Sequence, residues 1–343
     1  MRVGTVWRLG VLTVGMLLLS GPLPAADGTG FPYHLVRRIA LPAAGAVHAL
    51  LFDPRTRTIY VAQGPRIEGY SLAGARLVLQ RRLPGTVSAL ARTGTGQIVA
   101  AVRTPAQLVF LSPRTLAVTH RRTLDLAKPA ALLYDRKAHL LFLESRAGAT
   151  IVRLDPASGR SLGQVRVPGT PGEMAGNGRG TLYVTNAARD ALEVIDARSM
   201  RRTGSIPLSR CRAPSGLAMD TIGRRLFVGC ANDRALIVDA DLGFTFVRLP
   251  IPGGPRLRAA FAFHPFGAHG WKGGVFFAGA TAVAGIQMQA FIRYRNHGHL
   301  PLPARCSALT LVAPVGELWL ALASSARARP VIWVLGASRS EAQ

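Results

Sequence analysis

Cysteine and acidic residues are both scarce in this chain. Its 343 residues include three cysteines and 17 aspartates and glutamates. The cysteines lie too far apart in sequence for a zinc module, and no Cys-x-x-Cys-His motif offers a site for covalent haem. Gly-x-Ser-x-Gly, phosphate-loop and His-Glu-x-x-His motifs are also missing. We therefore expect neither a cofactor nor a metal, while an enzyme that assembles its site from several distant segments stays open.

Lysine is nearly absent, and arginine takes its place. The chain has three lysines and 39 arginines, and its formal net charge is +25. Such a surplus predicts a salt-dependent attraction to anionic partners. It does not identify the anion, because a genome whose base composition favours arginine would produce the same excess.

No long hydrophobic run that could span a membrane follows the first thirty residues. Residues 1–26 begin with Arg2 and Arg8, continue with an apolar run over 11–19, and end in small and turn-forming residues up to Ala26. This order predicts a signal peptide that is cleaved after Ala26, with the mature chain periplasmic or secreted and not transmembrane. Retention of the segment as an N-terminal anchor is the alternative.

A short run of β-branched, aromatic and other apolar residues recurs seven times along the rest of the chain. The runs start 39, 43, 41, 44, 49 and 43 residues apart, which is the period of propeller blades. Other strand-like segments surround each run, with turn residues such as Asn177-Gly178 between them. The seven runs are 59–61, 98–100, 141–143, 182–184, 226–228, 275–277 and 318–320.

The two ends of the chain complement one another. The seventh copy, from Cys306 to about Leu335, has room for only three strands. The segment 33–41 resembles the outer strands 77–83 and 118–124, so placing it on the last blade would close the ring and leave no open edge at the seam. The sequence therefore predicts an all-β fold over residues 27–343: a seven-bladed β-propeller of four-stranded antiparallel blades, with the N-terminal strand closing the last blade.

Two segments carry a family resemblance. Residues 182–186, Leu-Tyr-Val-Thr-Asn, followed by 192–196, Leu-Glu-Val-Ile-Asp, resemble the repeat of the YVTN β-propeller family, which is exported and surface-layer-like. Residues 226–230 and 236–240 are similar to other blades of that family. The resemblance covers roughly 175–250 and is degenerate elsewhere. It implies a binding or scaffold protein more often than an enzyme, while more distant propellers include lactonases and periplasmic redox enzymes.

Cations recur in the loops of one predicted face. Inner and third strands start from the same face, here called the top, so the loops before them share it. The blades are related by rotation, so the guanidinium groups of arginines in these loops would form a ring suited to phosphate, sulfate or carboxylate. Arginine is frequent in bottom loops too, so its abundance alone is the alternative explanation. The candidate anion-binding residues are Arg66, Arg103, Arg146, Arg189, Arg234 and Arg327, with Lys128, Arg212, Arg258 and Arg305 nearer the axis.

The leading interpretation is a non-catalytic binding or scaffold propeller that recognises an anionic ligand at its top face and channel mouth. Phosphate, acidic polysaccharide, lipid headgroups, nucleic acid and an acidic protein all fit this description, and we expect a monomer. The alternative is a propeller enzyme, such as a lactone hydrolase, with its site at the same channel mouth. A metal or converging carboxylates there would favour the enzyme.

The cysteines are expected to serve structure. Cys211 and Cys230 both fall at the top of the fifth blade, which predicts a disulfide between them. Cys306 begins the inner strand of the seventh blade, where a buried free thiol is expected rather than a nucleophile.

Three further groups receive structural interpretations. Glu173 falls in an inner strand near the channel mouth, where pairing with Arg258 or Arg305 is expected instead of acid catalysis. Arginine pairs at 37–38, 81–82, 121–122 and 201–202 lie on predicted outer strands, where charge blocks pairing with other chains. The histidines lie on opposite faces and cannot enclose one metal; they are His264 and His269 at the bottom, and His297 and His299 at the top.

Overall fold

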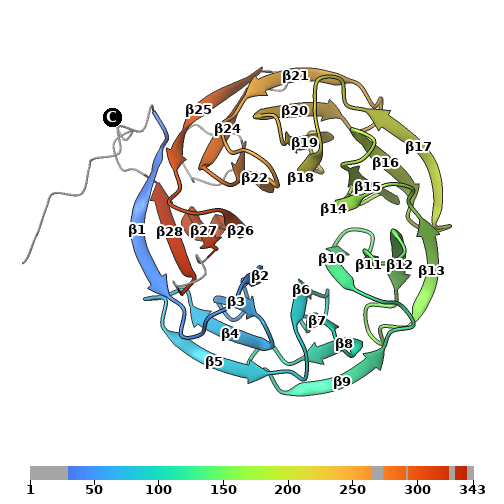
Figure 1. Ribbon diagram of the computed structural model, residues 1–343, viewed down its shortest axis with the longest axis vertical. Helices are drawn as coiled ribbons and strands as arrows, with labels where there is room; N and C mark the ends of the chain where they lie inside the picture. The colour runs from blue at the N-terminus through green and yellow to red at the C-terminus, as the bar shows by residue number, and fades with distance from the viewer. Residues whose placement is uncertain (1–29, 264–272, 291–292, 324–328, 338–343) are drawn as a thin grey trace, which may run out of the picture.

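Seven four-stranded antiparallel sheets surround a central axis in the computed structural model of the chain (Figure 1). The structure describes residues 30–263, 273–290, 293–323 and 329–337. Within these ranges the one helical element is a 3-10 turn, η1 (Ala313–Val315), and no helix is long and apolar enough to cross a bilayer. The predicted fold class is confirmed. The predicted signal peptide, 1–26, lies outside the described residues.

Each of the first four blades is continuous in sequence and runs from the inner strand outwards. Blade 1 is β2 (Val47–Asp53), β3 (Thr58–Gln63), β4 (Arg66–Ser71) and β5 (Leu77–Arg82). Blade 2 is β6 (Val87–Arg92), β7 (Ile98–Arg103), β8 (Ala106–Leu111) and β9 (Val118–Thr123). Blade 3 is β10 (Pro129–Asp135), β11 (Leu140–Ser145), β12 (Thr150–Leu154) and β13 (Ser161–Arg166). Blade 4 is β14 (Pro171–Gly176), β15 (Thr181–Asn186), β16 (Ala191–Asp196) and β17 (Arg201–Pro207).

The last three blades complete the ring. Blade 5 is β18 (Pro214–Asp220), β19 (Arg225–Cys230), β20 (Arg234–Asp239) and β21 (Thr245–Pro250). Blade 6 is β22 (Arg258–Phe263), β23 (Gly273–Ala278), β24 (Ala282–Ala290) and β25 (Arg293–Pro301). Blade 7 takes β26 (Cys306–Val312), β27 (Glu317–Leu322) and β28 (Val331–Ala337) from the end of the chain, and β1 (Tyr33–Ala40) from its beginning.

The hydrophobic core lies between neighbouring blades. Seven clusters of buried side chains occur, one at each interface between adjacent blades. Each second strand is therefore buried on both faces. In β11, for example, Phe142 packs towards blade 4 while Leu143 packs towards blade 2. This two-sided burial explains why the second strands are the continuous apolar runs that reveal the repeat in the sequence.

Strand β1 closes the ring. It pairs antiparallel with β28, and the two strands lie side by side in Figure 1. Tyr33 and Leu41 are buried at either end of the strand, and the Leu41 amide donates a hydrogen bond to the Pro330 carbonyl at 3.2 Å. The predicted closure is confirmed, and the predicted arginine pairs do lie on the outer strands β1, β5, β9 and β17.

The ladder registers define the two faces. In blade 1, Val47 pairs with Gln63 and Arg66 pairs with Arg82, so these residues share one end of the blade, the top. Asp53 pairs with Thr58 at the other end, the bottom. Because all seven blades have the same strand order, loops before inner and third strands lie at the top throughout the ring.

Candidate functional site

The inner strands of six blades carry a β-bulge at the same place, close to their top ends. After the first residue pair, the pairing with the second strand skips one residue, or two in β14. A bulge re-aims the side chain that it carries and often occurs beside functional sites. The skipped residues are His48, Ser88, Ala130, Gly172 with Glu173, Ser215 and Ser307.

Blade 6 differs, because β22 pairs regularly from its first residue, Arg258. The Nη1 of Arg258 lies 3.0 Å from Oε1 of Glu173, and the two side chains are 40% and 21% exposed. The other oxygen of Glu173 accepts a hydrogen bond from the Leu217 amide at 2.8 Å. Burial raises the pKa of the Glu173 carboxyl, against the opposing effects of Arg258 and of that amide. The predicted pairing of Glu173 with Arg258 is confirmed, and the pair bridges blades 4 and 6 across blade 5.

His48 lies within the electrostatic reach of two arginines. Its imidazole pKa is lowered, first by burial and then by the charges of Arg103 and Arg258. The imidazole is thus held neutral near pH 7, where it can donate one hydrogen bond and accept another. The channel mouth therefore combines two guanidinium groups, a neutral imidazole and one carboxylate that is already paired.

Glu144 is a functional-site candidate that the sequence interpretation missed. It lies near the top end of β11, is 1% exposed, and neither carboxylate oxygen has a hydrogen-bond partner among the residues that the structure describes. Nε of Arg146 is 3.7 Å away. Burial raises the pKa of Glu144 to about 7, although Arg146 and Arg258 act in the opposite direction. The repeat contains a signal for it, since the equivalent positions in the other blades hold small residues: Ala62, Ala101, Thr185, Gly229, Ala278 and Ala321.

The predicted ring divides into cations that have carboxylate partners and cations that have none. Arg146 and Arg189 lie 3.7 and 3.4 Å from the buried carboxylates of Glu144 and Glu193. Glu193 also forms an ion pair with Arg202 at 2.9 Å, and Arg258 forms one with Glu173. Arg327 lies outside the described residues. Within the described part of the chain, no ion pair involves Arg66, Arg103, Arg234, Lys128, Arg212 or Arg305.

The three cysteines take the places expected of them. Cys211 and Cys230 form a disulfide with a Cα–Cα distance of 5.3 Å, which joins the loop before β18 to the end of β19. Cys306 is a buried free thiol whose Sγ contacts the Ala308 carbonyl at 3.1 Å. Burial raises its pKa to about 12, so the thiolate required of a nucleophile is disfavoured.

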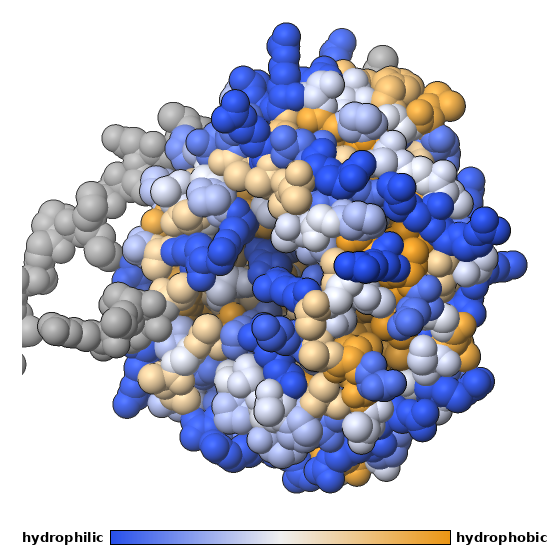
Figure 2. All heavy atoms as spheres, turned by 45° about the vertical axis from the view of Figure 1, so that its right-hand side comes forward, coloured by the Kyte–Doolittle hydropathy of each residue, from blue (hydrophilic) through white to orange (hydrophobic). Residues whose placement is uncertain are grey.

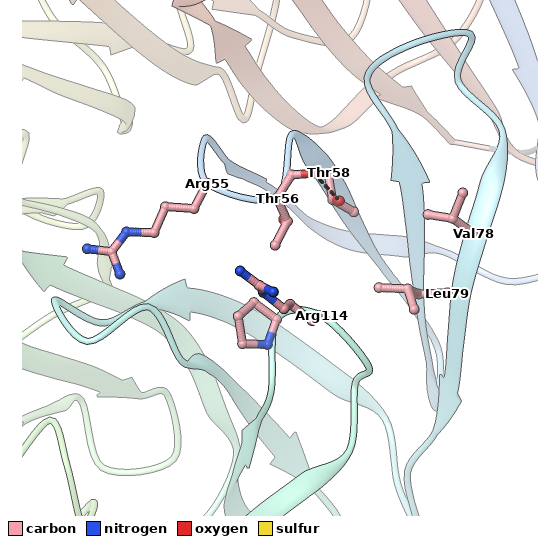
Figure 3. A pocket seen from close by; sticks show the side chains of 7 residues that line it. Arg55, Thr56, Thr58, Val78, Leu79 and Arg114 are labelled. Carbon is pink, nitrogen blue, oxygen red and sulfur yellow. Dashed lines mark hydrogen bonds between the residues drawn. The ribbon is translucent and has the colours of Figure 1, made fainter.

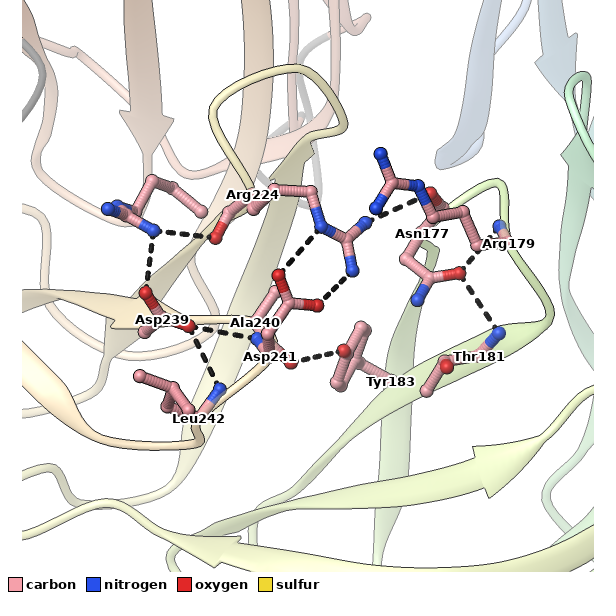
Figure 4. A network of polar contacts seen from close by, with 10 residues as sticks. Asn177, Arg179, Thr181, Tyr183, Arg224, Asp239, Ala240, Asp241 and Leu242 are labelled. Atoms are coloured by element: carbon pink, nitrogen blue, oxygen red, sulfur yellow. Dashed lines mark hydrogen bonds and ion pairs between the residues drawn. The ribbon is translucent and has the colours of Figure 1, made fainter.

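Carboxylates of the bottom loops are occupied by backbone groups and by arginines. The carboxylates of Asp135, Asp155 and Asp196 accept backbone N–H groups two and three residues ahead, as expected of turn formers. Within blade 5, Arg224 donates two hydrogen bonds to the Asp241 carboxylate, and Arg225 pairs with Asp239 at 2.7 Å (Figure 4). Tyr183 reaches from blade 4 into the same network and donates to the Ala240 carbonyl at 2.5 Å.

The two faces consequently differ in the carboxylates that their loops contain. Top loops contain three aspartates, and two of these cap backbone amides: Asp190 that of Ala213, and Asp233 those of Gly253 and Gly254. On the face shown in Figure 2, hydrophilic side chains crowd around a hollow near the middle of the ring.

A metal site finds no support among the described residues. No group of three or more histidine, cysteine, aspartate or glutamate side chains that could hold an ion occurs there. His297 contacts the Gly30 carbonyl at 3.0 Å, while His264 and His269 lie outside the described residues. No observation in this part of the chain favours the lactone hydrolase alternative.

Comparisons with known proteins show the fold alone. No protein-family model matches the sequence, and no curated protein matches it. Among solved structures, the chain is similar to a protein of the mitotic checkpoint complex, with a TM-score of 0.71 at 11% identity over 95% of this chain and 99% of the other. It is equally similar to the WD40 repeats of RRP9, with a TM-score of 0.71 at 11% identity over 90% and 99% of the two chains. Its structural neighbours are thus WD40 β-propellers.

Proposed function

We propose that the chain is an exported binding propeller, of the type that YVTN repeats form, and that its top face and channel mouth receive an anionic ligand. The observation that carries this proposal is the set of top-face cations that lack a carboxylate partner among the described residues: Arg66, Arg103, Lys128, Arg212, Arg234 and Arg305. Guanidinium groups that have no internal partner remain free to take phosphate, sulfate or carboxylate oxygens in a fork.

The channel mouth adds a defined geometry to this surplus of charge. Arg258 gives Nη1 to Glu173 and is still 40% exposed, so its remaining N–H groups can reach a ligand in the channel. The charges of Arg103 and Arg258 both lower the pKa of His48, whose neutral imidazole can donate one hydrogen bond and accept another. Propellers that assemble with other proteins, such as the one in the mitotic checkpoint complex, are consistent with a binding role.

The test compares two matched sets of surface arginines. The protein is residues 30–343, because all 28 strands fall in this segment, and the probe is polyphosphate, with binding followed by calorimetry at several salt concentrations. Neither set has an ion pair among the described residues, so no buried carboxylate is orphaned. The top set is Arg66→Gln, Arg103→Gln, Arg212→Gln and Arg234→Gln; the bottom set is Arg55→Gln, Arg57→Gln, Arg136→Gln and Arg179→Gln.

The top set is expected to weaken binding by at least about tenfold and to flatten its dependence on salt, because each lost phosphate contact removes roughly 0.7 from the slope of log K against log salt. The bottom set is expected to change affinity by less than about threefold, since it alters only the long-range field. Equal losses in the two sets would overturn the proposal.

A further inference from the structure

Exposed apolar side chains gather on the bottom face. Seven large hydrophobic side chains are classed as exposed in the described part of the chain, and Val36 on β1 is the only one away from the bottom end of its blade. The other six lie on blades 1, 5 and 7. They are Leu77, Val78, Ile222, Leu242, Phe244 and Val315.

Blade 5 presents three of these side chains on a rigid support. Ile222, Leu242 and Phe244 are 67%, 76% and 50% exposed in two neighbouring turns. The fork between Arg224 and Asp241 ties one turn to the other (Figure 4). The centroid of the Phe244 ring lies 6.2 Å from that of Phe246, and the Phe246 ring lies 5.8 Å from the ring of Tyr294 on blade 6. The ion pair and the ring contacts therefore support the two turns that expose these apolar side chains.

A groove at the bottom rim combines charge with an apolar wall. It lies between blades 1 and 2 and has a volume of about 340 Å³. Figure 3 shows Arg55 on one side, Val78 and Leu79 on the other, and Arg114 between them. A hydrogen bond from the Tyr60 hydroxyl to the Pro113 carbonyl joins the two blades beneath it. An anionic group at the arginines and a hydrocarbon chain along the valine and leucine would satisfy both parts of this lining.

The bottom face keeps a positive charge in spite of its aspartates. Asp53, Asp239 and Asp241 are each paired with an arginine. Exposed cations without an ion pair among the described residues remain on the bottom of blades 1 to 4: Arg55, Arg57, Arg114, Arg136, Lys137 and Arg179. Apolar tips on blades 1, 5 and 7 and basic side chains on blades 1 to 4 thus share one side of the molecule.

We propose that the bottom face docks on a membrane surface containing anionic phospholipids, with a headgroup phosphate between Arg55 and Arg114 and with the blade 5 tips inserted among the lipids. Tips on three blades of one face can be covered at once by a flat partner, and an anionic bilayer matches both the exposed apolar groups and the arginines of the same face. This surface is distinct from the top face, and it stands whether or not the top face binds a soluble anion.

The test is flotation of the protein with vesicles. Residues 30–343 are used, because the apolar run at 11–19 would bind lipid by itself. Vesicles contain equal parts of phosphatidylglycerol and phosphatidylcholine, or phosphatidylcholine alone. The variants are Arg55→Gln with Arg114→Gln, and Leu242→Ser with Phe244→Ser. The matched control is Arg66→Gln with Arg234→Gln at the top face, and urea unfolding verifies that every variant folds.

The unmodified protein is expected to float with the anionic vesicles only. The double variant of Arg55 and Arg114 should lower the partition coefficient about thirty-fold. The double variant of Leu242 and Phe244 should lower it at least about tenfold. The top-face control should change it by less than about threefold. In a Phe244→Trp variant, the fluorescence emission of the introduced tryptophan is expected to shift to shorter wavelengths on anionic vesicles. An equal loss in the control, no loss in the apolar pair, or displacement by soluble glycerophosphoglycerol at the same headgroup concentration would each overturn the proposal.

Discussion

Arg258 and Glu173 form a 3.0 Å ion pair between inner strands of blades that are not neighbours. The intervening blade takes part through the Leu217 amide, which donates to the second oxygen of Glu173. The pair thus fixes the position of a guanidinium group at the start of an inner strand, at the channel mouth. Glu173 also competes with any anionic ligand for Arg258, because the ligand must share that guanidinium with the internal carboxylate.

Removal of this competition should strengthen anion binding. Glu173→Gln is expected to raise the affinity for polyphosphate about fivefold, equivalent to roughly 1 kcal/mol for a partly exposed pair. Arg258→Gln should lower the affinity by at least the same factor. Calorimetric titration of both variants measures the two effects. A loss of affinity in Glu173→Gln, with its folding intact, would contradict the assigned competition.

The closing strand offers a test of how the ring holds together. Leu41→Ala removes a fully buried side chain at the seam and should reduce the free energy of unfolding by about 2–5 kcal/mol. Val36→Ala on β1, where the side chain is 47% exposed, should change it by less than about 0.5 kcal/mol. Urea unfolding of the two variants provides the comparison, and similar values would mean that the seam adds little to stability.

The disulfide should account for a measurable part of stability. Cys211 and Cys230 are 19 residues apart, and closing a loop of that length stabilises a protein by about 3 kcal/mol in the chain-entropy treatment. Reductant is therefore expected to lower the melting temperature of the natural protein. It should leave the melting temperature of the Cys211→Ser, Cys230→Ser variant unchanged, whereas a Cys306→Ala protein should still respond.

The fold could be predicted from the sequence because its strongest signal is local and repeated. Second strands are buried on both faces by neighbouring blades, so their apolar runs stand out even where the rest of the repeat is degenerate. Strand order then assigns loops to faces without any knowledge of side-chain contacts. The Cys211–Cys230 bridge and the Glu173–Arg258 pair followed from that assignment.

The partners within the site could not be predicted in the same way. A bulge that skips His48 or Ser215 depends on how an inner strand fits the curvature of the ring, and no residue type marks it uniquely. Likewise, the sequence places Arg146 and Arg189 in a ring with Arg66 but does not show that buried glutamates partner the first two. Pairing across strands decides which cations remain for a ligand.

Glu144 should make the stability of the propeller depend on pH. Burial raises its pKa from 4.5 to about 7. In the unfolded chain the carboxyl ionises near pH 4.5, whereas in the folded chain it keeps its proton up to about pH 7, so the folded state binds the extra proton between these values. Stability is therefore expected to fall as the pH rises through this window, by roughly 3 kcal/mol in total.

Glu144→Gln removes the ionisable group while it keeps the size and shape of the side chain. At pH 4, where the natural carboxyl is protonated in both states, the variant and the natural protein should unfold at similar urea concentrations. At pH 8 the variant should be the more stable by up to roughly 3 kcal/mol, because it avoids a buried charge whose ion pair, with Arg146, is as long as 3.7 Å. Urea unfolding at pH 4, 6 and 8 measures the difference. Parallel stability curves for the two proteins would show that Glu144 ionises normally and that the top of blade 3 admits water.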